Sequence, residues 1–142
     1  MPNSFPYGGM ENPYLTFVSP SIILGDKSSA YIAAHEICHS WFGNLVTNKN
    51  WTHFWLNEGF TRYAERLIIK RNYNESRYGC QTQIGIYVAQ NEINDYINEG
   101  KPEYTMLSPS VLHDGPDDIL SDIPYEKGFL FLTYLEVNNV LS

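Results

Sequence analysis

The pattern of hydrophobic and polar residues changes near residue 28 and divides the chain into a short extended part and a longer helical part. Residues 1–13 are rich in Pro, Gly and Asn, a composition that favours turning or extended backbone. Short apolar runs at 15–18 and 22–24 are strand candidates. Farther along, apolar residues recur at helical spacing. The pattern predicts a mainly α protein with a small β element, the α+β class.

Four helices are expected in the second part. Residues 25–29 offer capping groups for a first helix that ends near Gly43. A second helix begins around Asn57, a third spans 75 to about 97, and a last one begins near Tyr125 and runs past Leu135. One face of the second helix is apolar and belongs to the core: Phe60, Tyr63, Ala64, Leu67 and Ile68. Residues 99–124 contain four prolines and are predicted to form a long loop, a feature that is often functional.

The most informative feature is the run His-Glu-Ile-Cys-His at 35–39, followed nineteen positions later by Glu58. Two imidazoles at i and i+4 lie on one helical face, where both reach a single ion. A carboxylate from a second helix supplies a third ligand, and an open fourth position is typical of a catalytic zinc site. His35, His39 and Glu58 are therefore the predicted ligands of one Zn²⁺. On the pentapeptide alone, the alternative is a buried helix with two satisfied histidines.

Glu36 lies between the histidines, one residue off their face, where it can act on a water molecule instead of the metal. Metal and base together convert water into a nucleophile near neutral pH. Glu65 lies seven residues after Glu58, two turns along the same helix. It is either a partner that orients a histidine or a solvated charge. Cys38 lies inside the motif, and packing behind the site is favoured over metal ligation.

A second segment, Gly8-Gly9-Met10-Glu11, follows Pro6 and Tyr7. Paired glycines allow close backbone approach, so the segment can line a cleft and pair with an extended peptide. Glu11 would then present its carboxylate to the free ammonium of that peptide. Taken alone, the same residues describe an ordinary turn.

With the zinc motif, these residues resemble the gluzincin aminopeptidases, the family of aminopeptidase N, aminopeptidase B and the bifunctional leukotriene epoxide hydrolase. The resemblance covers residues 6 to about 136 and depends on three motifs in order: Gly8 to Asn12, the zinc-site residues with Trp-Leu-Asn at 55–57, and Pro-Tyr-Glu-Lys-Gly at 124–128. The Gly-Gly form of the first motif, and residues 43–48, are similar to the aminopeptidase B and leukotriene hydrolase branch.

The resemblance implies a role for each matching residue. His35, His39 and Glu58 match the zinc ligands, and Glu36 matches the general base. Glu11 matches the carboxylate that holds the amine of the substrate, with Gly8, Gly9 and Met10 shaping that subsite. Tyr125 matches the phenol that stabilises the tetrahedral oxyanion; for this tyrosine in isolation, packing would be the commoner explanation.

These roles describe part of a thermolysin-like zinc metallopeptidase catalytic domain that releases the first residue of peptides with a free N-terminus. We divide residues 1–142 into an extended segment with the exopeptidase motif at 1–27, zinc-site helices at 28–98, a loop at 99–124 and the helix of the oxyanion tyrosine at 125–142. The first recognisable chemistry is already at residue 8, so we expect remaining domains of a parent chain to be missing here.

Two alternatives stay open at this point. Epoxide hydrolysis is disfavoured because Leu120 stands where the leukotriene hydrolase branch has a second tyrosine, although Asp117 matches an acidic residue linked to that reaction. The chain could also be a non-catalytic remnant that keeps the motif.

Composition limits the partners and the location. A formal charge of −7 argues against nucleic acid, and no apolar run reaches the length of a membrane span. The branch resemblance and the two cysteines favour a cytoplasmic location, with secretion as the alternative.

Overall fold

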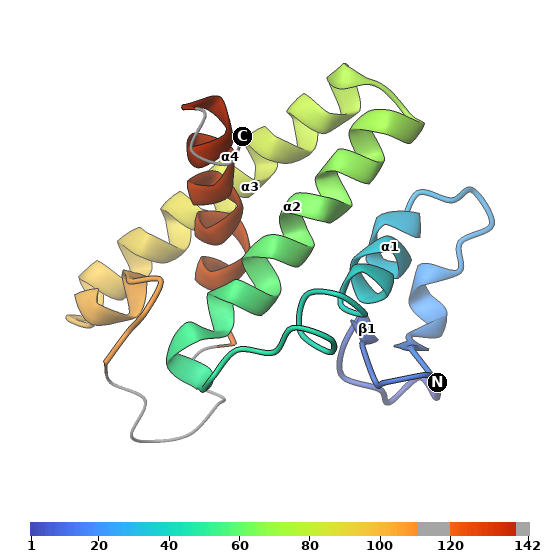
Figure 1. The fold of residues 1–142 in the computed structure, drawn as a ribbon, viewed down its shortest axis with the longest axis horizontal. Helices are drawn as coiled ribbons and strands as arrows, with labels where there is room; N and C mark the ends of the chain where they lie inside the picture. The colour runs from blue at the N-terminus through green and yellow to red at the C-terminus, as the bar shows by residue number, and fades with distance from the viewer. Residues whose placement is uncertain (111–119, 139–142) are drawn as a thin grey trace.

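The computed structural model describes residues 1–110 and 120–138, which form four α-helices and one short hairpin that lies at one side of the molecule (Figure 1). The strands are β1 (Gly9–Met10) and β2 (Phe17–Val18). The helices are α1 (Ala30–Cys38), α2 (Phe54–Asn72), α3 (Glu75–Asn98) and α4 (Gly128–Val137). The prediction of a mainly α protein with a small β element is confirmed.

The β element is a two-stranded antiparallel hairpin in which Gly9 pairs with Val18 and Met10 with Phe17. The predicted strand at 15–18 is confirmed for its second half. The strand candidate at 22–24 is wrong, because Pro20–Ile22 form a 3₁₀ turn. Proline at the first helical position and a Ser19 side chain that accepts from the Ser21 N–H both favour that turn.

The helix with the two histidines ends at Cys38, earlier than the end predicted near Gly43. His39 is its C-cap and keeps a helical backbone, so the two imidazoles stay one turn apart. After it the chain reverses direction, and Gly43 has φ of +132°, which favours glycine. The Gly43 N–H donates to the Val46 carbonyl at 2.9 Å, so the reversal has hydrogen bonds of its own.

The longest helices, α2 and α3, follow each other with a short connection (Figure 1). The Asn74 side chain accepts a hydrogen bond from the Arg77 N–H and caps α3, whose predicted span is confirmed. A 3₁₀ turn at Trp51–His53 leads directly into α2, which therefore begins at Phe54 and not near Asn57.

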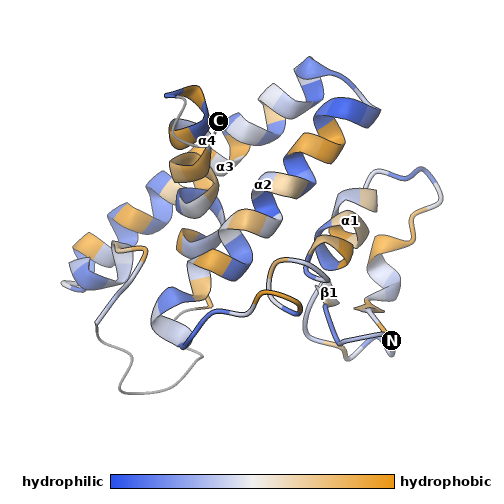
Figure 2. Cartoon of the chain, viewed as in Figure 1, coloured by the Kyte–Doolittle hydropathy of each residue, from blue (hydrophilic) through white to orange (hydrophobic). Residues whose placement is uncertain are grey.

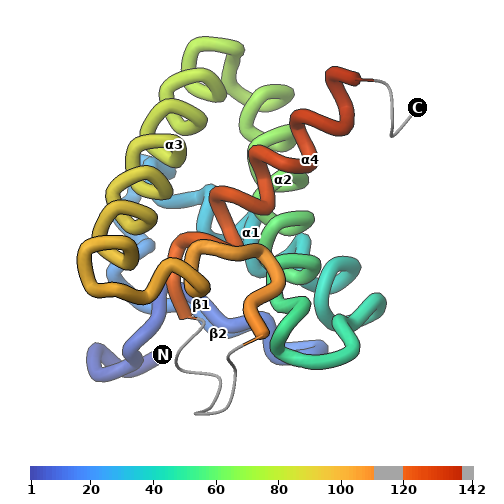
Figure 3. The backbone as a smooth tube through the Cα atoms, turned by 90° about the vertical axis from the view of Figure 1, so that its left-hand side faces the viewer, coloured from blue at the N-terminus to red at the C-terminus, as the bar shows by residue number. Residues whose placement is uncertain are grey.

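The predicted loop at 99–124 contains a 3₁₀ turn at Pro102–Thr105, and its last residues enter a π-helical turn at Ile123–Lys127. This turn leads into α4, which crosses α2 in the view of Figure 3. The two segments meet at glycines: a Cβ atom added to Gly128 would lie 2.9 Å from the Gly59 Cα. The glycines therefore permit an approach that larger residues would prevent.

The core lies where α2, α3, the π-helical turn and α4 meet. Its fully buried apolar side chains are Ile69, Ile123, Phe129 and Leu132. Hydrophobic residues dominate α4, whereas α2 and α3 carry mixed surfaces (Figure 2). Among the described residues, no helix combines the length and the apolar character that crossing a membrane requires.

Candidate metal centre

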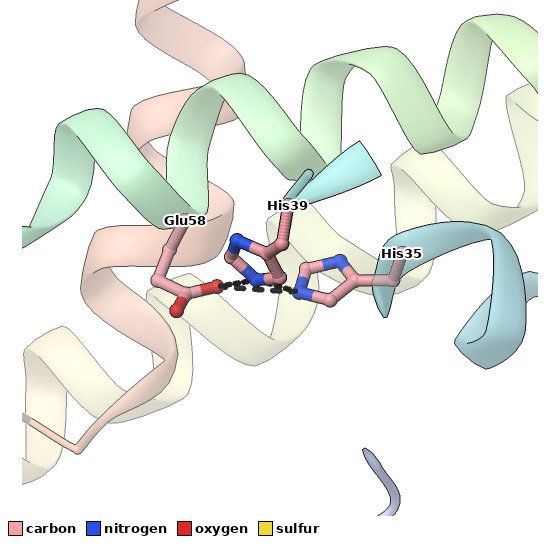
Figure 4. Close-up of side chains that lie close together, drawn as sticks. All are labelled: His35, His39 and Glu58. Carbon is pink, nitrogen blue, oxygen red and sulfur yellow. Dashed lines mark hydrogen bonds and ion pairs between the residues drawn. The ribbon is translucent and has the colours of Figure 1, made fainter. Parts of the chain in front are cut away.

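Three buried side chains from two helices converge on one point (Figure 4). Glu58 Oε2 lies 3.2 Å from His35 Nε2 and 3.2 Å from His39 Nε2, and the two Nε2 atoms are 3.1 Å apart. His35 lies in the last turn of α1, His39 is the C-cap of that helix, and Glu58 comes from α2. The structure therefore brings together the three residues that the sequence predicts as ligands.

The second ring nitrogen of each histidine fixes its tautomer. His39 Nδ1 lies 2.8 Å from the Phe42 carbonyl oxygen, which only accepts, so Nδ1 carries the hydrogen. His35 Nδ1 likewise lies 3.0 Å from the carboxylate oxygen of Glu65. In the neutral rings, both Nε2 atoms therefore direct a lone pair toward Glu58.

This donor set fits a tetrahedral divalent cation. With metal–nitrogen distances near 2.0–2.1 Å, the ligand atoms of a tetrahedral site lie about 3.4 Å apart. The observed separations of 3.1–3.2 Å are close to this value. Three electron-pair donors at such distances repel one another unless a positive charge lies between them.

The shifted pKa values of His35 and Glu58 also indicate that a positive charge is favoured between these groups. Burial by itself would raise the pKa of Glu58, but hydrogen bonds from His35 and His39 outweigh burial and lower this pKa to about 2. Burial would lower the pKa of His35, but hydrogen bonds to Glu58 and Glu65 raise it to about 9. Without a metal ion, a proton on the imidazole pair takes the place of the cation.

Glu65 orients His35 and is not a solvated charge. It is 1 % exposed, and its Oε2 also lies 2.7 Å from Arg62 Nη1. A histidine ligand commonly donates its other ring N–H to such a carboxylate, which fixes the ring orientation. Cys38 is buried and free, and it is not among the groups that converge on the site, in keeping with a packing role.

Glu36 is buried beside the cluster, and its carboxylate lies against Gly9 of β1. A Cβ atom at Gly9 would overlap with this carboxylate, whereas one at Gly8 would make an ordinary contact with Ile32. Close backbone approach was predicted for the paired glycines, and the structure shows that at Gly9 the approaching group is Glu36. Burial raises the pKa of Glu36 to about 7, where a carboxylate can both accept and release a proton.

A cavity of about 730 Å³ opens over these groups. The exopeptidase segment forms part of its lining, through Gly8, Gly9, Met10 and Glu11. One carboxylate oxygen of Glu11 lies within 4.8 Å of ligand atoms of both Glu36 and His39. An acidic group thus stands in the cavity at a short distance from the cluster, as the sequence predicted. Leu120 lines the same cavity, while Asp117 lies outside the described residues.

Tyr125 closes another side of this cavity. Its ring stacks on the His35 ring with centroids 5.9 Å apart and planes at 23°. Burial, followed by the nearby charge of Glu58, raises its pKa far above the usual value, so the phenol stays a neutral hydrogen-bond donor. Tyr125 is therefore next to the cluster of His35, His39 and Glu58, although the π-helical turn that carries it was not predicted.

Sequence reasoning missed the charged residues behind the site. Arg62 and Arg66 form ion pairs with Glu126, the residue after Tyr125. The i, i+4 spacing of the two arginines placed them on one face of α2, but their partner is about sixty residues away in the sequence. No local pattern could identify that pairing.

Comparisons with known proteins agree with this geometry. Residues 1–141 match the peptidase family M1 domain. The chain is 48 % identical over 136 residues to leucine aminopeptidase 2 of Emericella nidulans and 48 % identical over 136 residues to a leukotriene A-4 hydrolase homolog of Botryotinia fuckeliana. Each alignment covers 96 % of this chain.

Solved structures give the same relationship. The structure of yeast LTA4 hydrolase in complex with bestatin is 43 % identical, with a TM-score of 0.89 over 95 % of this chain. Native leukotriene A4 hydrolase from Saccharomyces cerevisiae is 44 % identical, with a TM-score of 0.85. The chain spans only 21–22 % of the length of these relatives. The family match extends over almost all of the chain, which therefore belongs to peptidase family M1.

Proposed function

We propose that this chain carries the catalytic centre of a zinc-dependent aminopeptidase, which hydrolyses the first peptide bond of substrates with a free N-terminus. The observation that carries the proposal is the position of Glu11 and Glu36 in the same cavity as the three converging ligand atoms. A zinc endopeptidase would also use a base such as Glu36, but it has no need of the second carboxylate, Glu11, because its substrate has no ammonium group there.

The cofactor proposed for His35, His39 and Glu58 is one Zn²⁺. Two imidazoles and one carboxylate are a typical ligand set of catalytic zinc and leave one position for water or substrate. When bound, zinc would polarise the substrate carbonyl and lower the pKa of water.

Four other residues bind the substrate, transfer the proton, stabilise the transition state and orient a ligand. Glu11 pairs with the α-ammonium and so fixes the first carbonyl of the peptide beside the cluster. Glu36 accepts a proton from the attacking water and later passes it to the leaving amine. Tyr125 donates a hydrogen bond to the oxygen that gains negative charge in the transition state. Glu65 holds the His35 ring in place during these steps.

The test is release of a fluorescent or chromogenic reporter from leucine and arginine derivatives by the full chain. We expect turnover that a chelator abolishes and added zinc restores, and no turnover of the same substrates with a blocked amine. Equal rates on free and blocked substrates would contradict the exopeptidase assignment. Bestatin, which yeast LTA4 hydrolase binds in its solved complex, is a suitable competing ligand.

The two alternatives predict other outcomes. A non-catalytic remnant would bind zinc without any turnover. Epoxide hydrolysis would convert the lipid epoxide, and a relative carries the name leukotriene A-4 hydrolase homolog. Leu120 in the cavity cannot supply the hydroxyl that a tyrosine would, so we expect little epoxide conversion.

A further inference from the structure

A series of buried charged side chains connects α1 to the π-helical turn, behind the cluster of His35, His39 and Glu58. Its first link is His35 Nδ1 with Glu65 Oε2, at 3.0 Å, and its second is Glu65 Oε2 with Arg62 Nη1, at 2.7 Å. The third is Arg62 Nε with Glu126 Oε1, at 3.4 Å. The predicted ligand His35 is thus connected to the residue that follows Tyr125.

Glu126 is held from two sides. Its other oxygen, Oε2, lies 2.7 Å from Arg66 Nη2, and this nitrogen also donates to the Gln81 carbonyl of α3 at 3.1 Å. The side chains of Arg66 and Glu126 are only 5 % and 8 % exposed. Glycine at position 85 of α3 leaves the space for them, because a Cβ atom there would overlap with Glu126 Oε2 and Arg66 Nη2.

A contribution to the stability of the fold is a poor explanation for the presence of these buried ion pairs. Removing charged groups from water costs several kcal/mol for each ion, and apolar residues of similar volume often stabilise a fold as well or better. What a buried ion pair adds is a constraint on position, since separating the partners leaves an uncompensated charge away from water. A role in positioning is therefore the more economical explanation.

The element fixed by this arrangement is the one that presents Tyr125. Neighbouring residues on a helix point in different directions, so Tyr125 reaches the cavity while Glu126 points to the arginines. The guanidinium carbon of Arg62 also lies 5.5 Å from the centre of the Tyr125 ring. π-helical turns are rare and occur frequently at functional sites.

We propose that Glu126, through its ion pairs with Arg62 and Arg66, is a positioning residue that fixes the Tyr125 phenol relative to the cluster of His35, His39 and Glu58. The inference deepens the proposed function and depends on it, because it assigns to Glu126 the placement of the oxyanion donor. Loosening the pairs displaces a group that acts in the transition state and leaves substrate binding by Glu11 intact.

Two variants test this from opposite directions. Glu126→Gln removes the charge but keeps the size, and Gly85→Ala displaces the pair while keeping every charge. The matched control is Glu75→Gln, which breaks an exposed ion pair with Lys70 at the far end of α2. For both test variants we expect kcat to fall by about 10- to 100-fold, with KM within about twofold and zinc content unchanged. The control should match wild type.

A double variant separates positioning from a general loss of structure. In a Tyr125→Phe background the phenol is absent, so Glu126→Gln should cause little further loss of kcat. The same fold-loss in both backgrounds, or no loss in the single variant, would overturn the proposal.

A readout without turnover keeps this inference independent of the proposed function. With 3-fluorotyrosine placed at position 125, the ¹⁹F resonance should shift or broaden in Glu126→Gln and Gly85→Ala but not in Glu75→Gln. An unchanged resonance in both test variants would overturn the positioning role even if the enzyme is active. A changed resonance in a chain that binds zinc without turnover would support the positioning of Tyr125 and contradict the aminopeptidase assignment.

Discussion

Glu36 and Glu58 are two buried carboxylates of one site whose surroundings move their pKa values in opposite directions. Burial raises the pKa of Glu36 to about 7, while hydrogen bonds from the two histidines overcome burial and hold that of Glu58 at about 2. Such divergence separates a proton carrier from a permanently ionised group. It supports Glu36 as the base and Glu58 as the ligand.

Replacing the base tests this division of roles. In Glu36→Gln the amide has the same shape but cannot accept a proton, so we expect kcat to fall by about 10²- to 10⁴-fold. Zinc content should stay at the wild-type value, because Glu36 is not one of the three proposed ligands His35, His39 and Glu58. Parallel rate and metal measurements check both statements, and a near-normal rate would refute the base assignment.

A substitution at Glu11 tests its proposed role as the anchor of the substrate amine. Glu11→Gln removes the charge that pairs with the α-ammonium, and we expect kcat/KM for free-amine substrates to fall by about 10- to 100-fold, mainly through KM. Substrate profiling with free and acetylated amines measures it. If the variant kept the wild-type preference for free amines, the anchor would have to be sought elsewhere.

The packing of β1 against α1 sets the space available to Glu36, the proposed base. Gly9 leaves room for the Glu36 carboxylate, and no other residue type would. Gly9→Ala should therefore displace Glu36 and reduce kcat by about 10-fold or more, whereas Gly8→Ala meets only ordinary contacts and is the matched control. Equal effects of the two substitutions on kcat would show that the space beside Glu36 is not critical.

Sequence patterns predicted the elements that depend on local order and missed those that depend on distant partners. The span of the third helix and the i, i+4 histidines depend on local order, and both were predicted well. The predicted end of α1 was wrong because residues 39–46 reverse the chain direction, and the hydrogen bonds of this reversal compete with continuation of the helix. The π-helical turn contains Glu126, whose ion pairs with α2 join distant parts of the sequence that no local period encodes.

For the whole molecule, the candidate metal centre joins α1 to α2. A cation bound there adds a further link between these two packed helices. Folding and metal binding should therefore be coupled.

The pH dependence of stability reports this coupling. In the metal-free chain, the raised pKa of His35 contributes stability that is fully present below pH 6.5 and lost as the pH rises through about 9. The lowered pKa of Glu58 contributes stability that is present above pH 4.5 and lost as the pH falls toward about 2. Both contributions are present together between pH 4.5 and pH 6.5, so the metal-free chain should be most stable in this range.

Urea unfolding at about pH 6 and about pH 9, with chelator and with zinc, measures the effect. Without metal, we expect the free energy of unfolding to decrease by about 1–3 kcal/mol when the pH is raised from about 6 to about 9. With zinc this decrease should largely disappear, because the cation replaces the proton. An identical decrease in both states would argue that zinc does not bind between these side chains.

The most direct test of the metal centre is elemental analysis of the purified full chain after dialysis against metal-free buffer. We predict about one zinc per chain in the wild type and in the control His53→Ala, whose imidazole lies outside the cluster, and almost none in His39→Ala or Glu58→Ala. A wild type that retains no zinc, or ligand variants that retain as much as the control, would contradict the account.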